Sequence, residues 1–172
     1  MAVDTMKNSA LIPWTEVSSW SCKACGKCCI GYRVPLKMDE MIMLSSQYGQ
    51  KVLEYGIGKA YLKNRINGRC VFQRPLMGRW ICILQGTKPT ACRLFPFRMH
   101  SKPLYKAGEN ANVRIGDKTY YLYMDPDCKG VVLGQPTERF SMQIVPEIVK
   151  IGVGLPVKQR FTTSKSIHWR PI

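Results

Sequence analysis

The stretch CKACGKCC, residues 22–29, places four cysteines within eight positions. A Cys-x-x-Cys turn directs two sulfur atoms at one centre, and Gly26 relieves the crowding of such a turn. The spacing occurs twice, because Cys25 can pair with either Cys22 or Cys28. The stretch therefore predicts a sulfur-rich site. Its candidate ligands are all the cysteines of the chain: Cys22, Cys25, Cys28, Cys29, Cys70, Cys82, Cys92 and Cys128.

Composition favours a metal over disulfide bonds as the partner of these thiols. Residues 1–14 lack the basic and apolar regions of a secretory signal, and no apolar run approaches the roughly 18 residues of a membrane span. We therefore expect a cytoplasmic protein without a membrane partner. In a reducing cytosol, clustered cysteines are more often metal ligands or redox groups than disulfides. Neighbouring Cys28 and Cys29 also fit poorly into a disulfide with each other. Disulfides and free thiols stay open as alternatives.

The donor types limit which group these residues can hold. His100 and His168 are the only histidines, so a buried site must be rich in thiolates, which selects zinc or iron–sulfur over magnesium or calcium. A Cys-x2-Cys-x2-Cys triplet with a distant fourth cysteine also begins the [4Fe–4S] sites of bacterial ferredoxins, although their usual Cys-Pro is missing here. Cys29 should leave the backbone on a different heading from Cys28, so it serves a second centre or packs as a thiol. One or two centres of [4Fe–4S] or zinc are predicted.

The remaining sequence predicts a small α+β domain with much loop. A short helix is expected at residues 38–49, with Asp39 as N-cap and Gly49 as its stop. Residues 50–64 have helical spacing at Val52, Leu53 and Tyr61, interrupted by glycines. A further helix is expected at residues 137–152, opened by Thr137 and kinked or divided by Pro146.

Short strands and one hairpin complete the expected fold. The β-branched and aromatic content of RCVFQRP (69–75) and RWICIL (79–84) predicts strands, with Pro75 bounding the first. The hairpin is ANVRIGDKTYYLYMD (111–125), where Gly116 and Asp117 separate two alternating runs. We expect a metal-organised, irregular domain, because ligands from distant segments tie loops together. Its predicted division is an extended lead-in at 1–20, a metal-binding domain at 21–155 and a basic tail at 156–172.

The order of the cysteine segments resembles a known family. CKACGKCC, then CVF, then WICILQGTKPTACRLFPF and the late DCKG are similar to the CxxCxxCC cysteine-cluster family, over residues 22–130. Two departures are Lys88-Pro89, where the family usually has Arg-Pro, and Gln85-Gly86, near its usual Tyr. The resemblance implies a zinc- or iron-chelating domain. Relatives of this kind include a part of flagellin lysine methylases, where an iron–sulfur cluster is associated with the fold.

The basic composition supports a second hypothesis. Lys and Arg number 26 against 11 Asp and Glu, which gives a formal net charge of +15 and attraction to polyanions. Residues 59–69 and 158–170 interleave cations with aromatic side chains, as segments that bind phosphates and stack on bases do. Tyr121 and Tyr123 share one strand face and either stack on bases or pack in the core. An RNA- or ribonucleoprotein-binding, ribosome-associated module is therefore the alternative to a purely metal-binding role, and a solvated basic face is the plain explanation.

No catalytic motif is legible in the sequence. It lacks a Gly-rich phosphate loop, a metalloprotease His-Glu motif and a Ser-His-Asp set. We therefore expect a non-catalytic protein whose metal is mainly structural. A redox or methyltransferase-accessory component is the third hypothesis.

Overall fold

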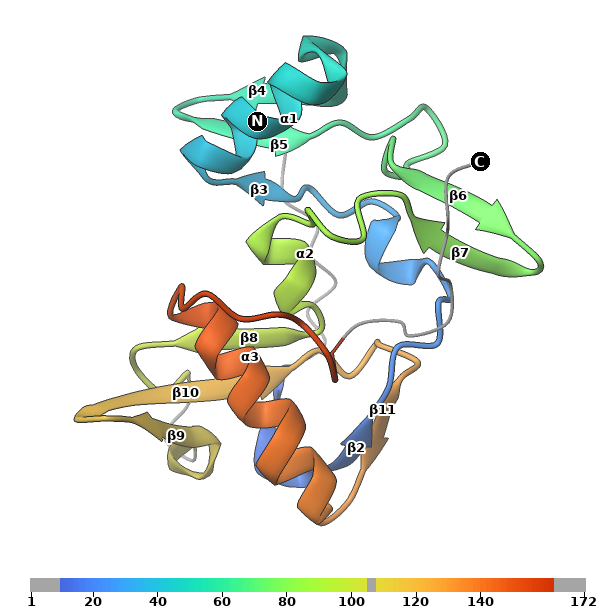
Figure 1. Ribbon diagram of the computed structural model, residues 1–172. Coiled ribbons are helices and arrows are strands. Elements are labelled where there is room, and N and C mark those ends of the chain that lie inside the picture. Colours follow the sequence, from blue (N-terminus) through green and yellow to red (C-terminus); the bar gives the residue numbers. More distant parts are fainter. Residues whose placement is uncertain (1–9, 105–107, 163–172) are drawn as a thin grey trace.

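The computed structural model describes residues 10–104 and 108–162 and consists of two halves, one containing α1 and the other α3 (Figure 1). Within these residues the strands form four small antiparallel sheets and the helices are short, which confirms the predicted α+β class. The strands are β1 (Ile12–Pro13), β2 (Val17–Trp20), β3 (Pro35–Leu36), β4 (Leu53–Gly56), β5 (Lys59–Leu62), β6 (Gln73–Leu76), β7 (Arg79–Cys82), β8 (Phe97–His100), β9 (Asn112–Ile115), β10 (Lys118–Met124) and β11 (Val131–Leu133). The α-helices are α1 (Met38–Tyr48), α2 (Thr90–Leu94) and α3 (Val145–Gly152).

The half that contains α3 is built on the sheet around β10. One edge of β10 pairs with β9 and then β1, and the other edge pairs with β8. Lys118 faces Ile115 across a two-residue turn, which confirms the predicted hairpin. Tyr123 on β10 is 0% exposed, and its hydroxyl accepts a hydrogen bond from the backbone N–H of Leu104 at 3.0 Å. This tyrosine packs in the core and does not stack on bases.

The helix predicted at residues 137–152 is present and is divided as its proline requires. Thr137 Oγ1 accepts a hydrogen bond from the N–H of Phe140 at 3.3 Å, so it caps the start. Residues Phe140–Ile144 form a π-helical turn directly before α3, which has Pro146 in its first turn. A proline lacks an N–H and crowds the preceding turn, and the wider π turn accommodates both effects.

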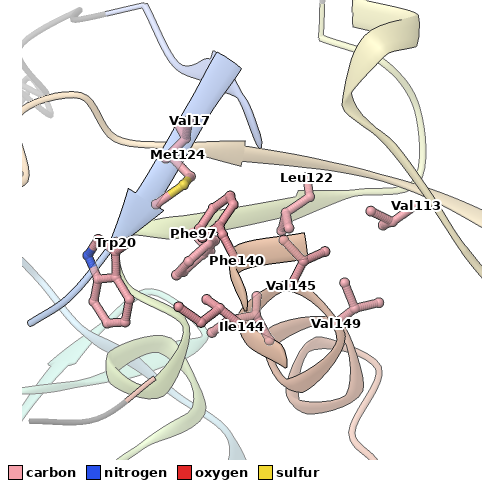
Figure 2. Close-up of a cluster of buried hydrophobic side chains, with 11 residues drawn as sticks. Val17, Trp20, Phe97, Val113, Leu122, Met124, Phe140, Ile144, Val145 and Val149 are labelled. Atoms are coloured by element: carbon pink, nitrogen blue, oxygen red, sulfur yellow. The ribbon is translucent and has the colours of Figure 1, made fainter. Parts of the chain in front are cut away.

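A cluster of buried side chains, here named the α3 core, fills the space between this helix and the strands (Figure 2). Phe97 lies edge-on to Trp20 at 5.4 Å between ring centroids and stacks on Phe140 at 6.3 Å. Burying a large apolar side chain of this kind stabilises a fold by roughly 1.5–3 kcal/mol. The α3 core consists of Val17, Trp20, Phe97, Val113, Leu122, Met124, Phe140, Ile144, Val145, Ile148 and Val149.

The other half packs α1 on the three-stranded sheet β3-β5-β4. Gly49 ends α1 with φ 78°, as predicted. The N-cap is Lys37 and not Asp39, because Glu40 reaches back to accept a hydrogen bond from the N–H of Lys37 at 3.0 Å. The buried cluster here, named the α1 core, consists of Val34, Leu44, Val52, Leu53, Leu62, Cys70, Phe72 and Leu84.

The helical interpretation of residues 50–64 is wrong. After a single 3-10 turn at Gln50–Val52, the chain forms the β4–β5 hairpin, in which Gly56 pairs with Lys59. Gly58 in the turn has φ 66°, a left-handed conformation that glycine adopts without strain. Of the three residues that suggested a helix, Val52 on the 3-10 turn and Leu53 on β4 enter the α1 core, whereas Tyr61 on β5 lies outside it, under the guanidinium of Arg33.

The β6–β7 hairpin projects from this half (Figure 1), and the N–H of Trp80 on β7 donates to the backbone oxygen of Ala24 in the N-terminal cysteine stretch. The strand predicted at residues 69–75 begins only at Gln73, and Pro75 lies within it, paired with Trp80. Because β6 has a neighbour on one side only, the missing N–H of a proline is tolerated there. The strand predicted at residues 79–84 is present as β7, which ends at Cys82.

Both flanking segments have described residues that pack on the fold. Trp14 donates its indole N–H to the backbone oxygen of Asn112 at 3.1 Å, and Arg93 on α2 donates to the backbone oxygen of Val157 at 2.9 Å. The division of the chain at residues 20 and 155 stays a prediction. None of the helices in the described part of the chain has the length and hydropathy needed to span a bilayer.

Candidate metal centre

Seven of the eight cysteines line one cavity of about 90 Å³ between the two halves. They come from four separate parts of the chain: the N-terminal stretch, β7, α2 and the loop before β11. Cys70, the eighth, is 5% exposed and belongs to the α1 core. Cysteines from remote parts of the chain thus line one cavity, and they are Cys22, Cys25, Cys28, Cys29, Cys82, Cys92 and Cys128.

The N-terminal cysteine stretch is fixed by the β6–β7 hairpin. The N–H of Trp80 donates to the backbone oxygen of Ala24 at 2.8 Å, and Gln73 Nε2 donates to that of Gly26 at 3.0 Å. Gly26 has φ 75°, and a Cβ on it would lie 2.7 Å from Trp80 Cβ and 2.5 Å from Gln73 Nε2. Glycine is thus required here both by the turn and by the close approach of the hairpin.

Cys28 and Cys29 lie on a 3-10 turn and their sulfur atoms are 3.7 Å apart. The hydrogen bond between the two thiols lowers the pKa of Cys28 to about 7, with help from the nearby Lys88 ammonium, although burial opposes the shift. The same hydrogen bond, together with burial, raises the pKa of Cys29. Of the two neighbouring thiols, Cys28 is therefore the one that loses its proton more readily, and a metal ligand must be a thiolate.

Burial is the main influence on the other thiols that titrate abnormally. Neighbouring sulfurs add to the effect, since each thiolate disfavours the next, and Lys88 opposes it for Cys22, Cys82 and Cys92. Neutral thiols of this kind release protons when a cation binds, because metal ligands must be thiolates. Burial raises the pKa of Cys22, Cys70, Cys82, Cys92 and Cys128.

Cys128 is brought to the cavity by contacts between two loops. The N–H of Ser21 donates to the backbone oxygen of Gly130 at 3.1 Å, and Lys27 Nζ donates to that of Asp127 at 2.9 Å. The indole N–H of Trp20 donates to the Sγ of Cys128 at 3.4 Å, which opposes the rise in its pKa. A donor aimed at sulfur stabilises a thiolate ligand.

Cys92 lies on α2. The half of the molecule that contains α1 holds the start of α2 in place. Glu40 of α1 accepts hydrogen bonds from the N–H of Thr90 at 2.6 Å and from its hydroxyl at 2.7 Å. These contacts cap the N-terminus of α2 with a carboxylate, which also suits the helix dipole. The cavity wall that carries Cys92 is thereby tied to α1.

The donor set suits zinc or iron, although the sulfurs do not yet surround one point. Among the described residues, no group of three or more His, Cys, Asp or Glu side chains has the arrangement of a formed metal site. His100 lies on β8 with its ring 5.9 Å from that of Tyr123, and His168 lies outside the described residues. The side chains around the cavity that can bind a metal are all cysteines. Soft and borderline metals prefer such sulfur ligands. The residues therefore fit a thiolate-bound metal in chemistry, and binding would draw the sulfurs together.

The sequence profile of a family described as "Putative zinc- or iron-chelating domain" matches residues 21–129. The chain belongs to the CxxCxxCC family. This membership confirms the resemblance seen in the sequence and supports a metal cofactor, zinc or iron, for the cysteine cluster. No curated protein and no solved structure matches the chain. The assignment of all eight cysteines of this CxxCxxCC domain as ligands stays a prediction.

Sequence reasoning missed the residues that hold the CxxCxxCC cavity in shape. Gln73 is 1% exposed and joins Gly26 to Arg69, whose guanidinium lies 3.7 Å above the ring of Trp80. Lys88 was noted only as a departure from the family pattern, yet it lies among the thiols. A single polar residue inside a short strand carries no local signal of such a role. These residues become visible only when the hairpin docks on the cysteine stretch.

Proposed function

We propose that this protein is a cysteine-ligated metalloprotein that binds zinc or an iron–sulfur cluster, and that the metal is mainly structural. The observation that carries the proposal is the cavity between the two halves, lined by cysteines from four segments of the chain. Ligands so far apart in sequence would join the α1 half to the α3 half. A bound metal would cross-link loops that are otherwise joined by hydrogen bonds and by the Lys27–Asp127 ion pair.

The residues around the thiols support this role. Lys88 provides positive charge beside several sulfurs, and Trp20 offers an N–H to Cys128. Four thiolates on one Zn²⁺ or on a [4Fe–4S]²⁺ core carry about −2, so a nearby ammonium and N–H donor stabilise the filled site. Cys28, Cys29, Cys82, Cys92 and Cys128 are half-buried around the cavity, whereas Cys22 and Cys25 are exposed to solvent.

Metal analysis of protein purified without oxygen tests the proposal. We expect either zinc, or iron with sulfide and a broad absorption band near roughly 400 nm. Replacement of the cavity cysteines by serine should lower the metal content. A wild-type protein free of zinc, iron and sulfide after anaerobic purification would contradict the proposal.

A second candidate function, binding of RNA, is favoured by the unbalanced surface charge. The described residues form two ion pairs, Lys27–Asp127 and Arg33–Glu54, in a chain with a net charge of +15. In the segment 59–69, Arg65 donates to the backbone oxygens of Val71 and Gln73, so it serves the fold. The exposed lysines of that segment, Lys59 and Lys63, are left for phosphate contacts.

Binding to a single-stranded RNA at several salt concentrations tests this second function. Phosphate contacts predict an affinity that falls steeply as salt rises. The double variant K59Q/K63Q should bind more weakly and with a smaller salt dependence. Absence of binding at low salt would remove the RNA hypothesis and leave the metal proposal untouched.

A further inference from the structure

We infer that the eight cysteines divide into two four-thiolate sites that lie side by side, an inference that rests on the proposed function. The inner site lies against the α1 core, and the outer site lies at the cavity mouth. The inner set is Cys29, Cys70, Cys82 and Cys92. The outer set is Cys22, Cys25, Cys28 and Cys128.

Packing separates the two sets. Cys70 is a member of the α1 core, and the other three inner cysteines are the ones that pack against it. Cys128 packs against the α3 core instead. Cys22 and Cys25 are exposed and belong to neither core. The inner sulfurs therefore share one apolar surrounding, whereas the outer ones lie between the cores and solvent.

Backbone hydrogen bonds hold three inner cysteines on adjacent strands and turns. The N–H of Cys70 donates to the backbone oxygen of Cys29 at 2.8 Å. Gln73 donates its N–H to the backbone oxygen of Cys70 at 3.0 Å and pairs with Cys82 across the β6–β7 ladder. Cys92 joins them from α2, which Glu40 fixes to the same half. Three inner cysteines thus lie on hydrogen-bonded neighbouring segments, and the fourth lies on a helix whose start α1 caps.

The outer set is held together by a different group of contacts. Ser21 donates to Gly130, and Lys27 lies against Asp127 with its Nζ 3.8 Å from Oδ2. These contacts bring the Cys-x2-Cys-x2-Cys triplet beside Cys128. A Cβ on Gly130 would overlap the backbone oxygen of Ser21, so this approach of the loops depends on glycine.

Cys28 and Cys29 mark the seam between the two sites. Cys29 packs on the α1 core, and Cys28 does not. Their sulfur atoms, 3.7 Å apart, bring the two sites into contact. Lys88 lines the same cavity as thiols of both sets, among them Cys22 and Cys28 of the outer set and Cys82 and Cys92 of the inner set. One ammonium at the seam offsets part of the negative charge of two neighbouring thiolate sites.

The division predicts that wild-type protein holds two metal centres and loses them one at a time. We would count metal per chain in anaerobically purified wild type, in C25S and in C92S. Each single variant should keep about half of the wild-type metal, and the variant C25S/C92S should keep almost none. The matched variant C22S/C25S, with both changes in the outer set, should keep the same half as C25S.

A measurement on the wild type alone tests the division even if the variants fail to fold. Transfer of metal to a chelator should show two phases of equal amplitude, the faster one from the exposed outer site. Loss of only the fast phase in C25S supports the division. One centre per chain, a single release phase, or loss of all metal in both C25S and C92S would overturn it. Wild-type protein without any metal would instead remove the proposed function.

Discussion

The α3 core and the α1 core are closed in different ways. The α3 core joins residues of β2, β8, β10 and α3, and its centre holds the stacked rings of Phe97 and Phe140. The α1 core contains one aromatic residue, Phe72, and is bordered by the thiols of Cys29, Cys82 and Cys92. The α3 core is thus completed by apolar side chains, whereas thiols that could bind a metal border the α1 core. The stability of the α1 half should therefore depend on metal far more than that of the α3 half.

Removal of the metal should produce the largest effect. Structural zinc contributes about 10–16 kcal/mol to folding in small zinc-binding peptides, and three of the candidate ligands, Cys29, Cys82 and Cys92, pack directly on the α1 core. After chelation, we expect amide hydrogen exchange to rise throughout α1, β4, β5, β6 and β7. Protection of β8, β10 and α3 should persist. Equal loss of protection in both halves would show that the two cores do not differ as described.

Substitution in the α3 core should give the opposite pattern. Phe140 is 0% exposed, and F140A removes a ring that stacks on Phe97. Its expected cost is about 3–5 kcal/mol, from lost burial and a cavity. Thermal unfolding should show this cost with and without metal. L44A in the α1 core is the matched variant, and its cost should appear mainly in the metal-bound protein.

The local elements of both halves were accessible from sequence. The Gly116–Asp117 turn, the Gly49 stop and the Thr137 cap each depend on residues within a few positions of each other, and all are present. The cysteine stretch likewise showed a sulfur-rich site. The helix expected at residues 50–64 failed because the same apolar residues suit two short strands, and tertiary pairing with β3 decides between them.

The non-local parts of the candidate site were not accessible. Nothing near Gln73 indicates that it will hold Gly26, and nothing near Glu40 indicates that it will cap α2. Sequence reasoning suggested that Cys28 and Cys29 differ in heading, but not which cysteines lie beside each of them. Such contacts depend on the tertiary packing of segments that are far apart in the chain. A single sequence gives no direct information on that packing.

The contact between α3 and the C-terminal segment lies at the junction of the two halves. Its disruption should destabilise the protein less than the changes above. Glu147 is 7% exposed and accepts hydrogen bonds from the N–H groups of Arg160, Phe161 and Thr162 and from the Thr162 hydroxyl. Thr162 and its neighbour Gln159 line the cavity.

In E147Q, an amide group replaces the carboxylate that accepts hydrogen bonds from the C-terminal segment. The NH₂ of the amide would then face N–H and O–H donors. The expected cost is about 2–4 kcal/mol, because buried donors lose their partner. Metal transfer to a chelator should become faster, since the segment covers the cavity less tightly. E138Q, an exposed position just before the π-helical turn that precedes α3, is the control and should leave the release rate unchanged. An unchanged release rate in E147Q would mean that the C-terminal segment does not limit the release of the metal.

The turn at Gly26 gives the most local comparison, because Gly31 shares its conformation without its surroundings. Both have positive φ, 75° and 67°, so alanine strains the backbone similarly at each position. A Cβ at Gly31 meets nothing within 4 Å, whereas one at Gly26 meets Trp80 and Gln73.

We therefore expect G26A to cost about 1–3 kcal/mol more than G31A, the usual penalty for overpacking. The displaced turn should also weaken metal binding, since it carries Cys25 and Cys28 on either side of the glycine. Competition with a chelator of known affinity would measure this in both variants. Equal affinities in G26A and G31A would show that docking of the β6–β7 hairpin on the cysteine stretch is not needed to hold the metal.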